Sequence, residues 1–382
     1  MDAQLKTINH FLLNKDIVHL NHGSFGACLK GAYNNQLHWQ NKLESNPTEF
    51  IVNILPEEIR KSREYLSKFI GCHRDSICFF QNPTTAVNAI ARGLNLKTGD
   101  IILGTDHEYG AMDKAWEFIT EKKGANYKRV ELPFPIESSK DIFSTIVNSI
   151  SQKTKILFIS HITSPTGIIF PVEDLCKYAR ENNIITIIDG AHVPGHIQLD
   201  IKDLNPDFYI GTCHKWLCTP KGVSFLYVRR NFQDSIDPLI IGWGWRDFDS
   251  NLSEFINNHE WWGTRDMSAY FCLPSALKMH QTKEMIDGRM HCQSKIPIIR
   301  NIVNDITSQM EICPNNMLGQ MASMVMPNID HVNLKTTLID EYKIEIPVFK
   351  WKNMSILRVS YQVYNTEKDI EKLSTVLTKI FK

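Results

Sequence analysis

The 382-residue sequence has no excess of either charge, since Lys and Arg together number 42 and Asp and Glu together also number 42. The basic patch that marks nucleic-acid-binding proteins is therefore not expected. The sequence also has no run of about 18 apolar residues, so no membrane span is expected. Its first residues do not pair a basic start with an apolar core, so no signal peptide is expected. These absences predict a cytoplasmic protein with neither nucleic acid nor membrane as a partner.

Disulfide and zinc patterns are missing as well. The nine cysteines are odd in number and include no C-x-x-C pair, which fits neither a disulfide framework nor a structural zinc site. Reduced thiols are the simpler interpretation, and no metal site is predicted.

The sequence does contain a regular alternation of short apolar runs with amphipathic stretches, which is typical of βαβ units and a mostly parallel sheet. Several of the runs are almost wholly apolar, as expected of strands buried on both faces. Seven strands are predicted, at Ile77–Phe80, Ile101–Gly104, Tyr127–Glu131, Lys155–Ser160, Ile184–Ile188, Asp207–Ile210 and Val223–Val228.

Near residue 270 this rhythm changes to a mostly helical segment followed by short strand-like pieces. We therefore predict a large α/β domain over residues 19–275, with a seven-stranded sheet between helices. A smaller C-terminal α+β domain would cover 276–382, and the N-terminal segment 1–18 would pack on it. Within the small domain, the spacing of Ile370, Leu373, Leu377 and Ile380 predicts a final helix with one apolar stripe.

Two charged residues lie beyond the C-terminal ends of predicted strands, where open α/β sheets bind ligands. Asp189 ends the run Ile184–Ile188, and such a partly desolvated acid needs a cationic or hydrogen-bonding partner. Lys215 follows Asp207–Ile210 among apolar residues, where a lowered pKa would make it a usable amine nucleophile. The alternative for Asp189 is an acid that caps a helix or lies in a surface turn. The alternative for Lys215 is an ordinary surface lysine.

A phosphate-binding site is predicted between the first strand and the next helix. Asn82–Ala86 joins them through a turn bearing hydroxyl groups, and free N–H groups at a helix N-terminus favour an anion. Simple capping of the helix by Thr84 or Thr85 is the alternative.

Together, these features resemble the fold-type I enzymes that depend on pyridoxal 5′-phosphate (PLP). Within them, the chain is similar to the class V aminotransferase superfamily and to its isopenicillin N epimerase-like branch. The resemblance runs from His19 to the final helix. It is carried by the motifs His19–Gly26, Gln81–Ala86, Asp106–Ala111, Ser160–Gly167, Asp189–His192, Thr212–Lys215, Gly263–Arg265, Leu357–Ser360 and Tyr364–Asn365.

The resemblance implies how PLP is held. Lys215 would carry the cofactor as a Schiff base, Asp189 would pair with its pyridine nitrogen, and His192 would lie near its phenolic oxygen. The remaining residues implied to bind the cofactor are Thr84, Thr85, Thr212 and His214 at the phosphate, Ala86 beside them, Tyr109 stacked on the ring, and Ser164 where related desulfurases often have Asn. Structural histidines at 192 and 214 and a core aromatic at 109 are the alternatives.

The substrate and the subunit arrangement are implied in the same way. Arg358 would clamp a substrate α-carboxylate, for which its guanidinium geometry is suited, or else form an ordinary ion pair. Asn21 and His22 would line the substrate end. Thr264 would reach the phosphate in a neighbouring subunit, which implies a homodimer with shared active sites. The tryptophans at 243, 245, 261 and 262 either serve only to pack the structure together or form a wall of the substrate cavity.

One departure bears on the reaction. Cysteine desulfurases of this superfamily carry a nucleophilic cysteine shortly before the carboxylate-binding arginine, whereas residues 340–353 contain none and the nearest is Cys313. Persulfide chemistry is therefore disfavoured. The resemblance predicts chemistry at Cα of an amino-acid-type substrate, either epimerisation or a related C–S elimination, with an aminotransferase as the alternative. A non-catalytic regulator is disfavoured because Lys215 is present.

Overall fold

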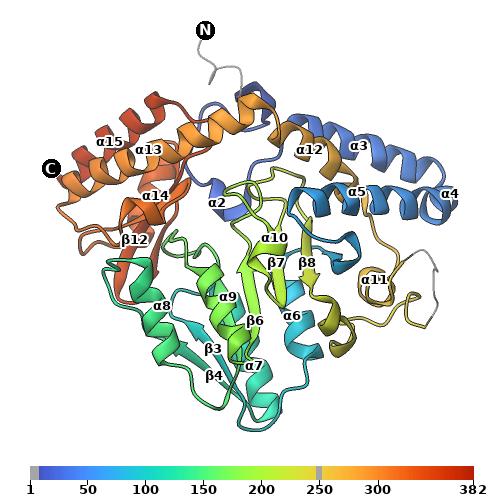
Figure 1. Cartoon of the computed structure of the whole chain (residues 1–382). Helices are drawn as coiled ribbons and strands as arrows, with labels where there is room; N and C mark the ends of the chain where they lie inside the picture. The colour runs from blue at the N-terminus through green and yellow to red at the C-terminus, as the bar shows by residue number, and fades with distance from the viewer. Residues whose placement is uncertain (1–7, 247–251) are drawn as a thin grey trace.

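A computed structural model describes residues 8–246 and 252–382, so residues 1–7 of the predicted N-terminal segment lie outside it. Its centre is a seven-stranded sheet in the order β2-β8-β7-β6-β5-β3-β4, in which β8 alone runs antiparallel to its neighbours (Figure 1). The strands are β2 (Ile77–Phe80), β3 (Ile101–Thr105), β4 (Asn126–Val130), β5 (Thr154–Ser160), β6 (Ile185–Gly190), β7 (Phe208–Thr212) and β8 (Ser224–Val228). The predicted mostly parallel sheet is confirmed.

Both faces of the sheet are apolar because each packs against helices. Along β6, Ile187 belongs to the core beneath α6 and α7, whereas Ile188 belongs to the larger core on the opposite face. The helices of this region are α3 (Lys30–Ser45), α4 (Pro47–Glu49), α5 (Leu55–Phe69), α6 (Pro83–Gly93), α7 (Gly110–Lys123), α8 (Ser139–Asn148), α9 (Val172–Glu181), α10 (Ile201–Leu204) and α11 (Glu254–Glu260). A continuous apolar strand is what such a three-layer arrangement requires.

The cap of α6 corrects one expectation. Asn82, and neither Thr84 nor Thr85, is the N-cap, and its side chain accepts a hydrogen bond from the Thr85 backbone N–H. Pro83 occupies the first helical position, which proline favours because it has no N–H to satisfy there.

The C-terminal part forms a separate layer, seen in orange and red in Figure 1. The antiparallel strands β9 (Met321–Val325), β11 (Val348–Trp351) and β12 (Met354–Ser360) pair in the order β11-β12-β9. Its helices are α13 (Lys283–Thr307), α14 (His331–Asp340) and α15 (Glu367–Phe381), and the preceding helix α12 (Leu273–His280) contains the predicted boundary at 275. The apolar stripe of α15 is buried at Ile370, Leu373 and Leu377.

The N-terminal segment connects the two domains. Strand β1 (Val18–His19) pairs in parallel with β10 (Ile344–Glu345) of the small domain. The helical turn α2 (His22–Phe25) follows immediately and reaches the large domain, where His22 Nε2 lies 3.1 Å from the Lys215 carbonyl oxygen. One short stretch of chain is thus anchored to both domains.

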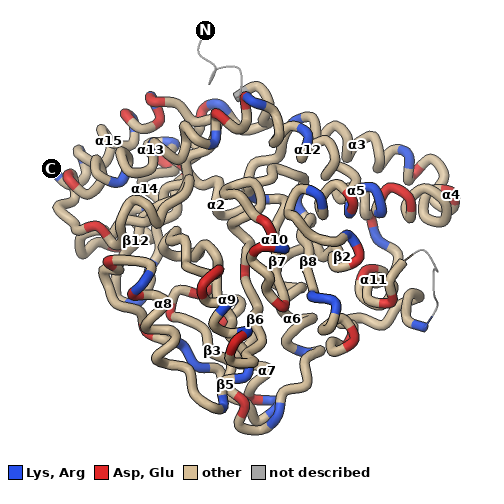
Figure 2. Tube along the Cα trace, in the orientation of Figure 1, with Lys and Arg blue, Asp and Glu red and all other residues tan. Residues whose placement is uncertain are grey.

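Lys and Arg are interspersed with Asp and Glu along the trace in Figure 2. Within residues 8–246 and 252–382, no helix is both long and apolar enough to cross a membrane.

Candidate active site

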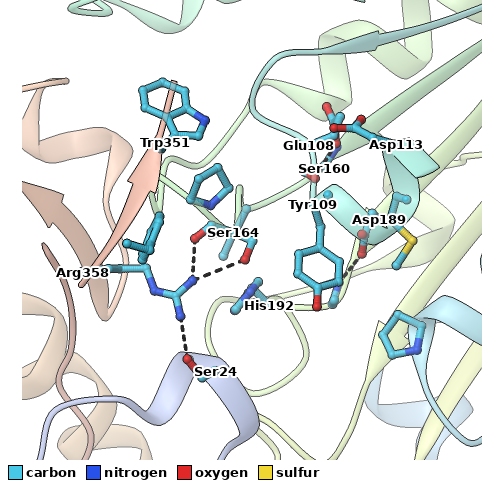
Figure 3. A pocket seen from close by; sticks show the side chains of 18 of the residues that line it. Ser24, Glu108, Tyr109, Asp113, Ser160, Ser164, Asp189, His192, Trp351 and Arg358 are labelled. Carbon is cyan, nitrogen blue, oxygen red and sulfur yellow. Dashed lines mark hydrogen bonds between the residues drawn. The ribbon is translucent and has the colours of Figure 1, made fainter. Parts of the chain in front are cut away.

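A cavity of about 800 Å³ opens at the C-terminal ends of the parallel strands, between the sheet and the β11–β12 hairpin. Its size is that of a small-molecule site. The predicted site residues that border it are Thr84, Tyr109, Ser164, Asp189, His192, His214, Lys215 and Arg358. Figure 3 shows Arg358 and Asp189 on different sides of this space, with Tyr109 and His192 between them.

Lys215 follows β7 and projects its amine into the cavity beside His192. Its Nζ lies 3.2 Å from His192 Nε2, and His192 Nδ1 accepts a hydrogen bond from the Trp216 indole at 3.3 Å. Burial lowers the pKa of His192 well below its ordinary value, so this imidazole is neutral and its Nε2–H points to the lysine. Burial, followed by the positive charge of Arg358, lowers the pKa of Lys215 to about 8. The lysine can therefore act as a neutral amine near physiological pH.

Asp189 is buried at the end of β6. One carboxylate oxygen accepts a hydrogen bond from the Ala191 backbone N–H at 3.0 Å. Burial raises the pKa of this carboxyl, against the opposing effects of that N–H and of Lys215. A buried acid bordering a cavity suits a cationic N–H donor, so the site fits a protonated pyridine ring held by Lys215 at another point.

Of the residues predicted to hold the phosphate, only some border the cavity. Thr84 and His214 border the cavity, with Thr84 in the first turn of α6. Thr85 does not, because its hydroxyl and its N–H both bond to Asn82. Ala86 and Thr212 are buried and do not border the cavity. A helix N-terminus, a hydroxyl and an imidazole remain available for an anion.

Arg358 is buried on β12 and borders the same cavity as Lys215, without an acidic partner among the described residues. Its Nη1 donates to the Ser164 carbonyl oxygen at 2.5 Å and its Nη2 donates to Ser24 Oγ at 2.9 Å (Figure 3). Its Nε has no hydrogen-bond partner among the described residues. Burial lowers the pKa of Arg358 to about 10. A desolvated guanidinium without a counter-ion strongly favours an incoming carboxylate.

Asn21 and His22, which the sequence predicts at the substrate end, do not border this cavity. Asn21 donates to Glu345 at 2.8 Å and accepts from the Ser24 hydroxyl at 2.5 Å. His22 Nδ1 lies 3.1 Å from the Tyr364 hydroxyl, and neither residue borders the cavity. In the helical turn α2, Ser24 borders the cavity together with Gly23 and Phe25, and Asn21 supports Ser24 through their hydrogen bond.

Thr264 and the tryptophan cluster lie elsewhere. Thr264 is exposed and does not border the cavity of its own subunit. Trp262 packs against Phe80, Trp243 is 80% exposed, and none of the four tryptophans lines the cavity.

Aromatic walls are instead supplied by Phe349 and Trp351, which sequence reasoning missed. Both lie on β11, and their position in a short hairpin before Arg358 is the signal that could have indicated them. A second omission is Glu108, a buried acid on the cavity wall directly before Tyr109.

Comparisons with known proteins agree with this geometry. A family model described as aminotransferase class-V matches residues 40–373. The chain is 29% identical to isopenicillin N epimerase of Amycolatopsis lactamdurans, with 97% of this chain and 96% of that protein covered. It is 26% identical to a probable chloroplastic L-cysteine desulfhydrase of Arabidopsis thaliana, with 94% and 82% covered.

A solved structure with the same fold contains the expected cofactor. It is a lysine-to-alanine variant of C-DES with glycine covalently linked to PLP. The two chains superpose with a TM-score of 0.86 at 20% sequence identity, and 97% of this chain and 98% of that chain are covered.

Proposed function

Because the chain belongs to the class-V aminotransferase family and is a PLP-dependent enzyme, we propose that it removes the Cα proton of an α-amino acid whose carboxylate binds Arg358. Epimerisation at that carbon is the leading outcome. Elimination of a sulfur-bearing β-substituent is the second candidate, and the similarity to desulfhydrases favours it. The observation that carries the proposal is the buried Arg358 guanidinium, which has no acidic partner among the described residues and borders the same cavity as Lys215.

The residues around the cavity have separate roles in this proposal. Lys215 would attach PLP covalently, Asp189 would accept a hydrogen bond from its ring nitrogen, and Thr84 and His214 would hold its phosphate. Tyr109 and Ser164 would border its ring. When bound, PLP supplies an electron sink for the negative charge that develops at the substrate Cα.

Lys215 is the residue that would move the Cα proton of the substrate. The Lys215 amine would take the Cα proton, and its lowered pKa of about 8 suits a base near neutral pH. His192, neutral and 3.2 Å away, orients the amine. The Tyr109 phenol borders the same cavity and is a second group able to carry a proton, as inversion at a carbon requires.

The substrate side chain would extend toward β11. Phe349 lies beside Arg358, with the guanidinium carbon 5.9 Å from its ring centroid, and Trp351 continues the wall. No cysteine is found among the described residues that line the cavity, so a persulfide carried by the enzyme is not part of the proposal. The aromatic part of this lining suits an apolar side chain or a thioether, beside the charged residues Arg129, Lys350 and Lys352 that also border the cavity.

The deciding experiment incubates the PLP-loaded enzyme with L- and D-amino acids and S-substituted cysteines in D₂O. We expect deuterium at Cα together with loss of optical purity. Release of pyruvate and a thiol would instead establish the elimination. Turnover that occurs only when a keto acid is added would make the enzyme an aminotransferase, and absence of Cα exchange with every substrate would refute the proposal.

We also propose a homodimer in which Thr264 serves the partner's site, because this residue is exposed and does not border its own cavity. Mixing an inactive Lys215→Ala variant with an inactive Thr264→Ala variant should then restore part of the activity, since one hybrid site keeps both residues. The measurement compares the mixture, after subunit exchange, with each variant alone. If the mixture remains as inactive as its components, the sites are not shared.

A further inference from the structure

Glu108 is a buried carboxyl group to which the proposed function assigns no role. It is 5% exposed and borders the same cavity as Asp189. Thr105 Oγ1 donates to one oxygen at 2.7 Å, and the Ser160 N–H and hydroxyl donate to the other at 2.9 and 2.5 Å. Ser160 also pairs in register with Asp189 on the neighbouring strand. Three adjacent strand ends therefore bring two buried carboxyl groups to one wall, which Figure 3 shows.

The surroundings of Glu108 disfavour a second negative charge. All three hydrogen-bond partners are neutral, and no described basic group forms an ion pair with it. The titratable neighbours are Asp189 on β6, Asp113 on α7 and Tyr127 on β4, and Asp113 already bonds to Arg129. Burial is the main cause that raises the pKa of Glu108 to about 8; the hydrogen bonds from Ser160 and Thr105 lower it in part, and the nearby acids Asp189 and Asp113 raise it. Two desolvated carboxyl groups without enough cations do not both ionise readily.

We propose that Glu108 is a positioning residue that stays protonated and so leaves Asp189 as the charged carboxylate facing the cofactor's ring nitrogen. This inference rests on the proposed function, in which Asp189 pairs with that nitrogen. The hydrogen bonds are compatible with a neutral acid. The hydroxyl of Ser160 or Thr105 can rotate to accept the Glu108 proton, while the Ser160 N–H continues to donate.

A neutral Glu108 performs two tasks at once. It satisfies the buried Ser160 N–H, which would be costly to leave unpaired. It also avoids adding charge beside Asp189, so the negative charge remains on the group that meets PLP. Because Glu108 immediately precedes Tyr109, its hydrogen bonds also hold the turn from which Tyr109 enters the cavity.

Glutamine is the matched test, because it has the shape of a protonated glutamate and cannot ionise. In the PLP-loaded enzyme, Glu108→Gln should keep the dissociation constant of PLP within roughly twofold, whereas Glu108→Ala should weaken binding roughly tenfold by leaving buried donors unpaired. The visible absorption of bound PLP should change in the wild type as the pH rises through about 8, when Glu108 ionises. This change should be absent, or moved to higher pH, in Glu108→Gln.

Glu117→Gln, at an exposed position of α7, is the control and should match the wild type in both measurements. The inference is overturned if Glu108→Gln loses PLP as severely as alanine does, because an ionised carboxylate would then be needed. It is also overturned if the alkaline change is identical in the wild type and Glu108→Gln. Should Glu108→Ala fail to fold, the glutamine variant decides alone.

Borohydride reduction of each variant separates this inference from the proposed function. PLP fixed to Lys215 in every variant supports the proposed attachment whatever the glutamine result. PLP fixed elsewhere, even in the wild type, refutes that attachment independently of Glu108.

Discussion

Replacing Lys215 with alanine should lower turnover at least roughly a thousandfold, because it removes both the anchoring amine and the group that moves the Cα proton. The structure gives this amine a single imidazole partner at 3.2 Å and a pKa lowered to about 8. His192 cannot replace it, since burial keeps the pKa of that imidazole well below its ordinary value. Steady-state rates on the best substrate of the panel provide the measurement.

The same variant should still bind PLP noncovalently, because Asp189, Thr84 and His214 remain. After borohydride reduction, PLP should be absent from the peptide that contains residue 215. Lys202→Ala, at an exposed position of α10, is the control and should keep full activity. Substantial turnover in Lys215→Ala would contradict the role proposed for this lysine.

Arg358→Ala should reduce kcat/KM about 100- to 1000-fold, mainly through a higher KM, because a charge-assisted pair with the substrate carboxylate is lost. Cofactor content should be unchanged, since Arg358 contacts Ser164 and Ser24 but would not hold the phosphate. Because the Arg358 charge helps to lower the pKa of Lys215, the pKa of the free lysine in the apoenzyme should rise in this variant.

Arg358→Lys separates charge from geometry. It keeps the positive charge but not the planar fork, so it should recover only part of the lost kcat/KM. Arg180→Ala, at an exposed position of α9, is the control. A different result would contradict this assignment. If Arg358→Ala loses PLP, and the enzyme that keeps PLP has an unchanged KM for the substrate, then Arg358 contacts the cofactor and not the substrate.

The main lines of the fold could be predicted because burial of both sheet faces leaves a strong pattern. Ile184–Ile188 is apolar at nearly every position, and β6 occupies almost the same residues. The edge strand β4 is less constrained, and its observed bounds, Asn126–Val130, lie one residue before the predicted ones. Asp189 and Lys215 could be singled out because each follows such a strand.

Other parts of the site depend on contacts that no local pattern records. The motif at Asn21–Ser24 identifies the segment correctly, but the helical turn decides that Ser24 faces Arg358. In the sequence, Glu108 is indistinguishable from other polar residues in turns. Its role depends on Ser160, 52 positions later, which only the fold brings beside it. The aromatic wall of Phe349 and Trp351 likewise exists only because the small domain packs over the sheet edge.

The pairing of β1 with β10 has a consequence for biosynthesis. Asn21 and its partner Glu345 are separated by 324 positions in the chain, so residue 345 must be synthesised before the N-terminal turn can dock. Until then Ser24 lacks the support that presents it to Arg358. Contacts of such long sequence separation form late and slowly. A nascent chain is therefore expected to stay inactive until the segment containing residues 345 and 358 has been synthesised.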